Sequence, residues 1–304
     1  MAPEIGTRTL VHGLLREDGT VDGAELYAVA EALGMTDQQV RLCVKRLVAD
    51  GRFTQEGRGR RSRLHAAPDA AGSLAPDVDY VRHAYRQDRG LAPWDGNWHL
   101  FAFAVPETDR RARDTFRDTL LHLGAAPLQG GLYVCANAIG PIVEAHADGL
   151  GVRPVLTRCT TRDLRVGEED DPVRLAARLW PLREVAARHT ALAALAQARL
   201  DRLTGPDRLT GTERLVCAVE LAAAFTDAMR PDPLLPPELL PRPWPGTRAR
   251  ALFARCWEAL AEGGAAEGPG SLRLFRLYAR TGAAGGGTAW PGPDPSATRR
   301  HPED

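Results

Sequence analysis

Apolar residues recur at helical spacing in three short segments near the N-terminus, at residues 7–16, 22–33 and 36–50. Asp22 is followed three residues later by Glu25, which is the spacing of a helix N-terminus. Gly34 stops the same segment, as glycine commonly does just after the last turn of a helix. The pattern therefore predicts three short helices joined by tight turns within the first 50 residues.

The third predicted helix separates buried from exposed positions clearly. Thr36 and Gln39 have the T-x-x-Q spacing of a capping box, so the helix should begin at Thr36. One face is apolar and is expected to be buried, namely Val40, Val44, Leu47 and Val48. The outward positions are then Gln38, Arg41, Leu42, Lys45 and Arg46. Arg41 and Lys45 are like charges one turn apart, so a polyanion on this face would stabilise the helix.

A basic β-hairpin is predicted directly after this helix. Residues 52–55 form its first strand, and residues 57–62 (GRGRRS) form a tip that we expect to be a flexible positive loop before the chain returns at 63–65. Residues 36–65 hold eight basic and three acidic residues, a net charge of +5 within a chain whose formal charge is zero. A turn, a helix with a basic face and an arginine-rich wing favour DNA binding through the major groove and the flanking phosphates.

The rest of the chain alternates between strand-like, helix-like and proline-rich segments. Residues 66–79 are rich in Ala, Pro and Asp and are typical of a linker, and a short helix is predicted at 80–92. The elements expected next are a strand at 98–105, a helix at 108–122, a strand at 132–135, a helix at 139–148 and a strand at 152–158. From 170 to 262 the pattern is helical, with a break at the proline-rich residues 231–245.

Composition excludes several classes of protein. Five well-separated cysteines without a C-x-x-C pair predict reduced thiols, with no disulfide framework and no zinc site. The N-terminus lacks the pattern of a signal peptide, and no apolar run approaches the ~18 residues of a membrane span, so we expect a soluble cytoplasmic protein. No nucleophile elbow, phosphate loop or paired histidines were found. We therefore expect no catalytic residue, metal or cofactor.

Three stretches resemble the PaaX family of bacterial regulators, named for the repressor of phenylacetic acid degradation genes. They are VRLCVKRLVADGRF with GRGRRSRL, then WDGNWHLFAFAVPETDRRARDTFRDTLLHLGAAPLQGGLYVCAN, then DPLLPPELLPRPWPGTRARALF. The resemblance runs over roughly residues 7–262. It implies a dimeric repressor of palindromic operators, released by phenylacetyl-CoA or another aryl-CoA or acyl-CoA effector. It also implies a ferredoxin-like, Cas2-like βαββαβ central domain.

The sequence thus predicts an α+β protein that regulates transcription and is not an enzyme. The expected parts are a winged helix-turn-helix at 1–66, a linker and connecting helix at 67–92, a ferredoxin-like domain at 93–167, an all-helical domain at 168–280 and a disordered tail at 281–304. The residues expected to contact double-stranded DNA are Thr36, Gln38, Gln39, Arg41, Leu42, Lys45, Arg46, Arg58, Arg60, Arg61 and Arg63. The effector site and the helices that form the homodimer are not assigned.

Two other functional hypotheses stay open at this point. A Cas2-like enzyme that processes nucleic acid would need acidic metal ligands at a strand end, and Asp95 is the nearest candidate. Its place in the turn Trp94-Asp95-Gly96 favours a turn residue instead. The other hypothesis is a protein-interaction scaffold with an inert winged helix.

Overall fold

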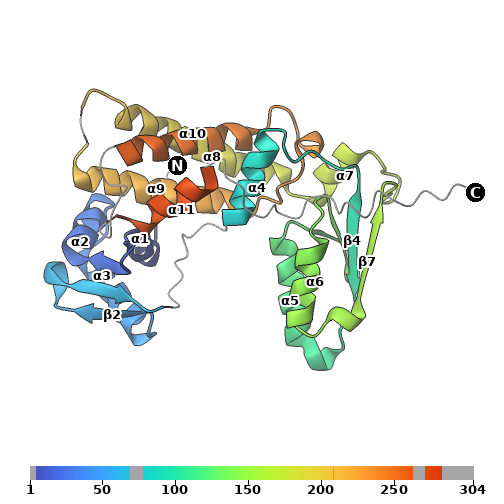
Figure 1. The fold of residues 1–304 in the computed structure, drawn as a ribbon, viewed down its shortest axis with the longest axis horizontal. Coiled ribbons are helices and arrows are strands. Elements are labelled where there is room, and N and C mark those ends of the chain that lie inside the picture. The colour runs from blue at the N-terminus through green and yellow to red at the C-terminus, as the bar shows by residue number, and fades with distance from the viewer. Residues whose placement is uncertain (1–4, 69–77, 208, 263–270, 283–304) are drawn as a thin grey trace, which may run out of the picture. The chain divides into compact units, whose positions relative to one another are not determined.

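A computed structural model describes residues 5–68, 78–207, 209–262 and 271–282 (Figure 1). Two compact units can be distinguished by their internal contacts. The first unit contains the described residues within 1–81, 186–229 and 245–284, and the second contains those within 82–185 and 230–244. Each of these units combines segments that are distant along the chain. The domain boundaries expected from the sequence stay a prediction.

The first unit begins with three helices and a small antiparallel sheet, which we call the N-terminal module (residues 5–66). Its elements are α1 (Thr7–Gly13), β1 (Thr20–Asp22), α2 (Gly23–Ala32), α3 (Asp37–Ala49), β2 (Phe53–Glu56) and β3 (Arg63–Ala66). The strand order is β1-β3-β2, so Leu64 on the central strand lies opposite Val21 on one side and Gln55 on the other. Leu10, Val21 and Leu64 are fully buried and belong to the core of the module.

Four longer helices complete the first unit. They are α8 (Leu182–Leu203, in this unit from residue 186), α9 (Gly211–Met229), α10 (Pro245–Leu260) and α11 (Arg273–Gly282). The half-buried Arg199 on α8 forms a bidentate ion pair with Glu220 on α9, with N–O distances of 2.7 and 2.9 Å. Phe225 on α9 stacks on Phe253 on α10 at 4.0 Å between ring centroids. α1 and α2 pack on α9, so the N-terminal module shares a core with these helices.

The second unit is built around a four-stranded antiparallel sheet. Its elements are α4 (Val78–Asp88, in this unit from residue 82), β4 (Trp98–Phe103), α5 (Arg110–His122), β5 (Ala126–Gln129), β6 (Leu132–Cys135), α6 (Gly140–Gly149), β7 (Leu156–Thr161) and α7 (Pro172–Leu179). The strand order β5-β6-β4-β7 and the succession β-α-β-β-α-β are those expected of a ferredoxin-like domain. α5 and α6 pack side by side on one face of the sheet (Figure 1).

A tryptophan-rich cluster covers part of the other face of this sheet. Trp98 on β4 is buried and stacks against Trp180, which follows α7, at 6.3 Å between ring centroids. The Trp180 indole N–H donates to the Gly124 carbonyl at 3.0 Å, so its polar atom is satisfied inside the core. Leu235 and Leu239 pack into the same cluster. Trp98 and Trp180 therefore serve core packing.

Buried hydrogen bonds at Leu234 hold the proline-rich segment 231–245 in place. Leu234 has a left-handed backbone conformation with a φ of 49°. Its carbonyl accepts hydrogen bonds from the Gln87 amide at 2.7 Å and the Asn137 amide at 2.9 Å, and its N–H donates to Asp232 at 2.9 Å. Asn137 also lies 3.4 Å from the ring of His83. The four polar residues of this network are buried, so it holds the segment against α4 and the end of β6.

Several expectations need correction. α1 ends at Gly13 rather than at residue 16, because Arg16 bonds through its backbone N–H to Thr20 and pairs with Leu272. The last strand of the sheet starts at Leu156 rather than at residue 152. Residues 153–155 form a 3₁₀ turn instead, since a proline at 154 has no N–H for a strand ladder.

All the predicted parts except the ferredoxin-like domain fall partly outside the described residues. The positions concerned are 1–4 of the winged helix-turn-helix, 69–77 of the linker, 208 and 263–270 of the helical domain, and 283–304 of the tail. Within the described part of the chain, no helix has the length and hydropathy required to cross a lipid bilayer.

Candidate nucleic-acid interface

The start of α3 confirms the capping box read from the sequence. The Gln39 N–H donates to the Thr36 hydroxyl at 3.2 Å, and the Thr36 N–H donates to the Gln39 side-chain carbonyl at 2.7 Å. The first turn of the helix is thus fixed by its own side chains. Thr36 and Gln39 remain exposed, but part of their hydrogen-bonding capacity is used by the helix itself.

The outward face of α3 carries the polar and basic residues predicted for it. Gln38, Arg41, Leu42, Lys45 and Arg46 are all exposed, and Leu42 is the most exposed large apolar residue of the helix at 48%. Val40, Val44 and Leu47 are buried as expected. Val48 was wrongly placed in the buried stripe: it is 36% exposed, because at helical spacing it falls at the edge of the stripe, whereas Leu47 in the same turn is buried.

The tip of the hairpin is folded onto α2, which differs from the flexible loop expected from its glycines. Residues 59–61 form a 3₁₀ turn, and the Ser62 hydroxyl donates to the Gly59 carbonyl at 2.6 Å. The Gly23 N–H at the start of α2 donates to the Ser62 carbonyl at 2.8 Å. A side chain at Gly23 would collide with the backbone of Ser62 and Gly59, so only glycine permits this approach.

The four arginines of the hairpin differ in whether they form ion pairs within the protein. Arg60 turns back onto the module, with its guanidinium 3.2 Å from Glu31 and 3.7 Å from Asp37 and its carbon 5.6 Å from the centroid of the Tyr27 ring. The other three are Arg58, Arg61 and Arg63, which are exposed and form no ion pair with any described residue. Arg60 therefore positions the hairpin against α2 and α3, and its neighbours remain available to solvent.

The same absence of ion pairs extends to α3. Arg41, Lys45 and Arg46 have no acidic partner within 4 Å among the residues that the structure describes. These side chains and the three free hairpin arginines belong to one module, so six exposed cations without partners occur within residues 41–63.

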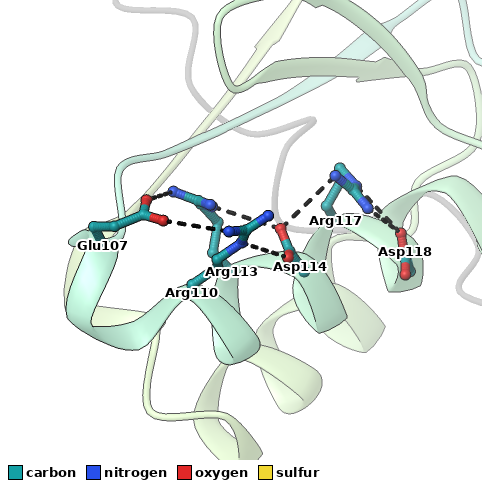
Figure 2. Close-up of polar contacts among 6 residues, drawn as sticks. All are labelled: Glu107, Arg110, Arg113, Asp114, Arg117 and Asp118. Carbon is teal, nitrogen blue, oxygen red and sulfur yellow. Dashed lines mark hydrogen bonds and ion pairs between the residues drawn. The ribbon is translucent and has the colours of Figure 1, made fainter.

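The arginine-rich helix α5 provides a contrast within the same chain. Figure 2 shows a continuous series of ion pairs along its exposed side, made by Glu107, Arg110, Arg113, Asp114, Arg117 and Asp118. The Arg113–Glu107 pair has an N–O distance of 2.7 Å, and the Arg117–Asp118 pair has one of 3.0 Å. The acidic residues compensate the positive charge of this helix, so arginine content alone does not identify a polyanion-binding surface.

A hollow of about 420 Å³ lies beside α3 on the side that faces the start of α1. Arg8 and Arg46 line it together with Leu42 and Cys43. Arg8 was missed by the sequence analysis, because it precedes the buried stripe of α1 and nothing in its spacing links it to α3. Burial raises the pKa of the Cys43 thiol, and the charges of Arg8 and Arg46 oppose that effect.

Asp95, the acidic residue on which the enzyme hypothesis depended, lies in a turn as the sequence predicted. Its carboxylate accepts the N–H of Asn97 at 2.8 Å and lies 3.6 Å from the ring of His99. Burial raises the pKa of Asp95, but the nearby His99 ring and the hydrogen bonds from Asn97 outweigh it and lower the pKa overall. The part of the chain that the structure describes contains no group of three potential metal-ligating residues.

Comparison with known proteins identifies two domains of this chain. A family model described as the PaaX protein central Cas2-like domain matches residues 91–173, and one described as the PaaX-like protein C-terminal domain matches residues 180–267. A solved structure, the uncharacterized protein Rv0674 from Mycobacterium tuberculosis, is 23% identical. That alignment covers 78% of this chain and 87% of that chain, with a TM-score of 0.45. The search of curated proteins finds no match.

Proposed function

The chain belongs to the PaaX family, and from that premise we propose that it is a cytoplasmic, DNA-binding transcriptional regulator rather than an enzyme. The family match lies in the central and C-terminal parts, outside the N-terminal module. The case for DNA binding at that module therefore depends on its own geometry.

The N-terminal module is assigned as a winged helix-turn-helix. The order α1-β1-α2-α3-β2-β3 and the sheet order β1-β3-β2 suit that fold, with α3 as the recognition helix and the β2–β3 hairpin as the wing. In this arrangement Gln38 and Arg41, near the start of α3, meet base edges in the major groove. Lys45 and Arg46 lie further along the helix, where they meet phosphates.

The observation that carries the proposal is the set of unpartnered cations on this module. Exposed side chains of one sign stay hydrated but repel one another, and a bound polyanion relieves that repulsion. The α5 surface shows that this chain supplies acidic partners elsewhere. Arg58, Arg61 and Arg63 on the wing suit the backbone flanking the half-site or a narrow minor groove. Arg8 extends the positive surface along the hollow beside α3.

The regulator is proposed to act as a homodimer on palindromic operators. Two-fold symmetry is the usual match to a palindrome, and half-sites one helical turn of DNA apart, about 34–36 Å, place two α3 helices in successive major grooves. The PaaX resemblance adds repression and release by an aryl-CoA or acyl-CoA effector such as phenylacetyl-CoA. Release requires that the effector bind more tightly to the form with the unfavourable spacing.

A gel-shift experiment on DNA from the protein's own upstream region tests the proposal. It is run with excess competitor DNA, with and without phenylacetyl-CoA, for the native chain and for Arg41→Ala. Arg111→Ala serves as the matched control, because Arg111 is an exposed arginine on α5 without an ion pair among the described residues. A specific shift weakened at least ten-fold by Arg41→Ala but not by Arg111→Ala supports the proposal. Equal behaviour of the two variants contradicts the role of α3.

A further inference from the structure

The segment that begins at Ser271 pairs with the turn that follows α1. The Glu17 N–H donates to the Ser271 carbonyl at 3.0 Å, and the Arg273 N–H donates to the Leu15 carbonyl at 2.8 Å. These are backbone bonds between residues more than 250 positions apart, and both lie within the first unit. They satisfy the Glu17 N–H and the Leu15 carbonyl, which belong to the turn that follows α1.

These two bonds make Arg16 and Leu272 an antiparallel backbone bridge. A side-chain ion pair reinforces the same contact. One turn into α11, the Arg276 guanidinium meets the Glu17 carboxylate through two N–O contacts of 3.0 Å. The Glu17 side chain is 20% exposed and that of Arg276 is 60% exposed, so the ion pair closes the solvent side of the contact.

The opposite face of α11 is anchored in an aromatic cluster. Phe275 meets Trp257 on α10 edge to face at 5.2 Å, and Tyr278 stacks on Trp257 at 4.6 Å. Tyr278 also meets Phe253 on α10 at 4.9 Å and Phe225 on α9 at 5.7 Å. α11 is therefore fixed to α9 and α10 by buried rings, and its polar start and exposed side hold the N-terminal module.

The turn that follows α1 also contacts α2. It connects α1 to β1 and α2, and the Arg16 side chain also forms an ion pair with Glu25 on α2. α1 and α2 both contact α3, so the turn that joins them adjoins the elements that position α3. The matched C-terminal family domain ends at residue 267, so α11 lies beyond both matched regions.

We propose that α11 is a clasp that couples the DNA-reading module to helices α9 and α10. When the clasp is closed, the turn after α1 is held and α3 is presented in one orientation. When it opens, the module is retained by its packing on α9 alone, and operator affinity falls. This regulatory role rests on the proposed function, whereas the clasp itself is a property of the free protein.

Arg273 permits a selective test, because it is the first residue of α11. Proline is tolerated at the first helical position, and the preceding residue Leu272 is already in an extended bridge, so Arg273→Pro should leave α11 intact. The proline removes the N–H that bonds to Leu15 and places a ring carbon against its carbonyl. Arg273→Ala is the matched control, since it removes the same side chain and keeps the N–H.

The primary measurement is amide hydrogen exchange of the free, full-length protein over residues 14–20. The Glu17 amide, which donates to Ser271, is expected to exchange at least ten-fold faster in Arg273→Pro than in Arg273→Ala, with unchanged exchange in α9. Equal exchange in the two variants overturns the clasp. Faster exchange throughout α9 and α10 as well also overturns it, because the contact is then part of the general fold.

Operator affinity is measured as a second readout on the same two variants. A three-fold or larger loss of affinity in Arg273→Pro relative to Arg273→Ala supports the coupling. Faster exchange with equal affinity overturns the regulatory role. If Arg273→Pro exchanges faster but the native chain binds no DNA, the clasp is established and the proposed function is overturned. The two failures are therefore distinguishable.

Discussion

Neutralising Arg60 and neutralising Arg61 are expected to have different effects, although the two residues are neighbours at the tip of the wing. Arg60 is held by Glu31 and Asp37 and lies over the Tyr27 ring. Arg61 is exposed and has no ion pair among the described residues. Arg61 is therefore free to meet a phosphate, and Arg60 is occupied within the protein.

The salt dependence of DNA binding gives the size of the effect. Each phosphate contact contributes about 0.9 to the slope of log K against log salt concentration. Arg61→Gln should lower that slope by about 0.9, so its affinity falls about 3.5-fold less than that of the native chain between 50 and 200 mM salt. The triple substitution of Arg58, Arg61 and Arg63 by glutamine should lower the slope by about 2.7.

Arg60→Gln should instead act on stability. Its carboxylate partners are half-exposed or more, so the ion pairs and the ring contact together contribute about 1 kcal/mol to the free energy of unfolding. The slope should change by well under 0.9. The assay is fluorescence anisotropy with labelled operator at four salt concentrations, beside urea unfolding of each variant. A slope change in Arg60→Gln equal to that in Arg61→Gln would refute the distinction between occupied and free arginines.

Three further predictions concern the scaffold. Thr36→Ala removes one half of the capping box with Gln39 and should cost about 1 kcal/mol of unfolding free energy, measured by urea denaturation. Burial lowers the pKa of His83 to about 4 from 6.5, so the unfolded chain takes up its proton first as the pH falls. Stability should therefore fall between about pH 6.5 and 4, by about 3 kcal/mol in all, and His83→Gln should flatten that part of the profile. Gly124→Ala should lower the melting temperature of the second unit, measured by calorimetry. Gly124 has a φ of 86°, and a methyl group there would collide with the Pro233 carbonyl. An unchanged melting temperature would contradict this reading.

The helices and strands with a clear period could be predicted from the sequence. α3 follows from the Thr36 capping box and its buried valines, and β6 was predicted with its observed bounds of 132–135. β1 was missed, because three residues are too few to show the alternation of a strand. Its place in the sheet depends on pairing with β3, more than 40 residues later.

The chemistry of the interface was only partly contained in the sequence. Composition marked Arg58, Arg60, Arg61 and Arg63 as equivalent, and only the fold shows that Arg60 is paired with residues from α2 and α3. The clasp of α11 could not be foreseen either. It joins two segments at opposite ends of the chain, and neither carries a local signal for the other.

The most direct test of the account is selection of binding sites from a random DNA pool by the full-length native chain and by Arg41→Ala. We predict that the native chain enriches a palindrome with half-sites one helical turn apart. Arg41→Ala should enrich the same palindrome with preference lost at one base pair in each half-site, which costs about 1–3 kcal/mol of discrimination. Failure of the native chain to enrich any sequence, or identical selected sites for both proteins, would contradict the reading of α3 as a recognition helix.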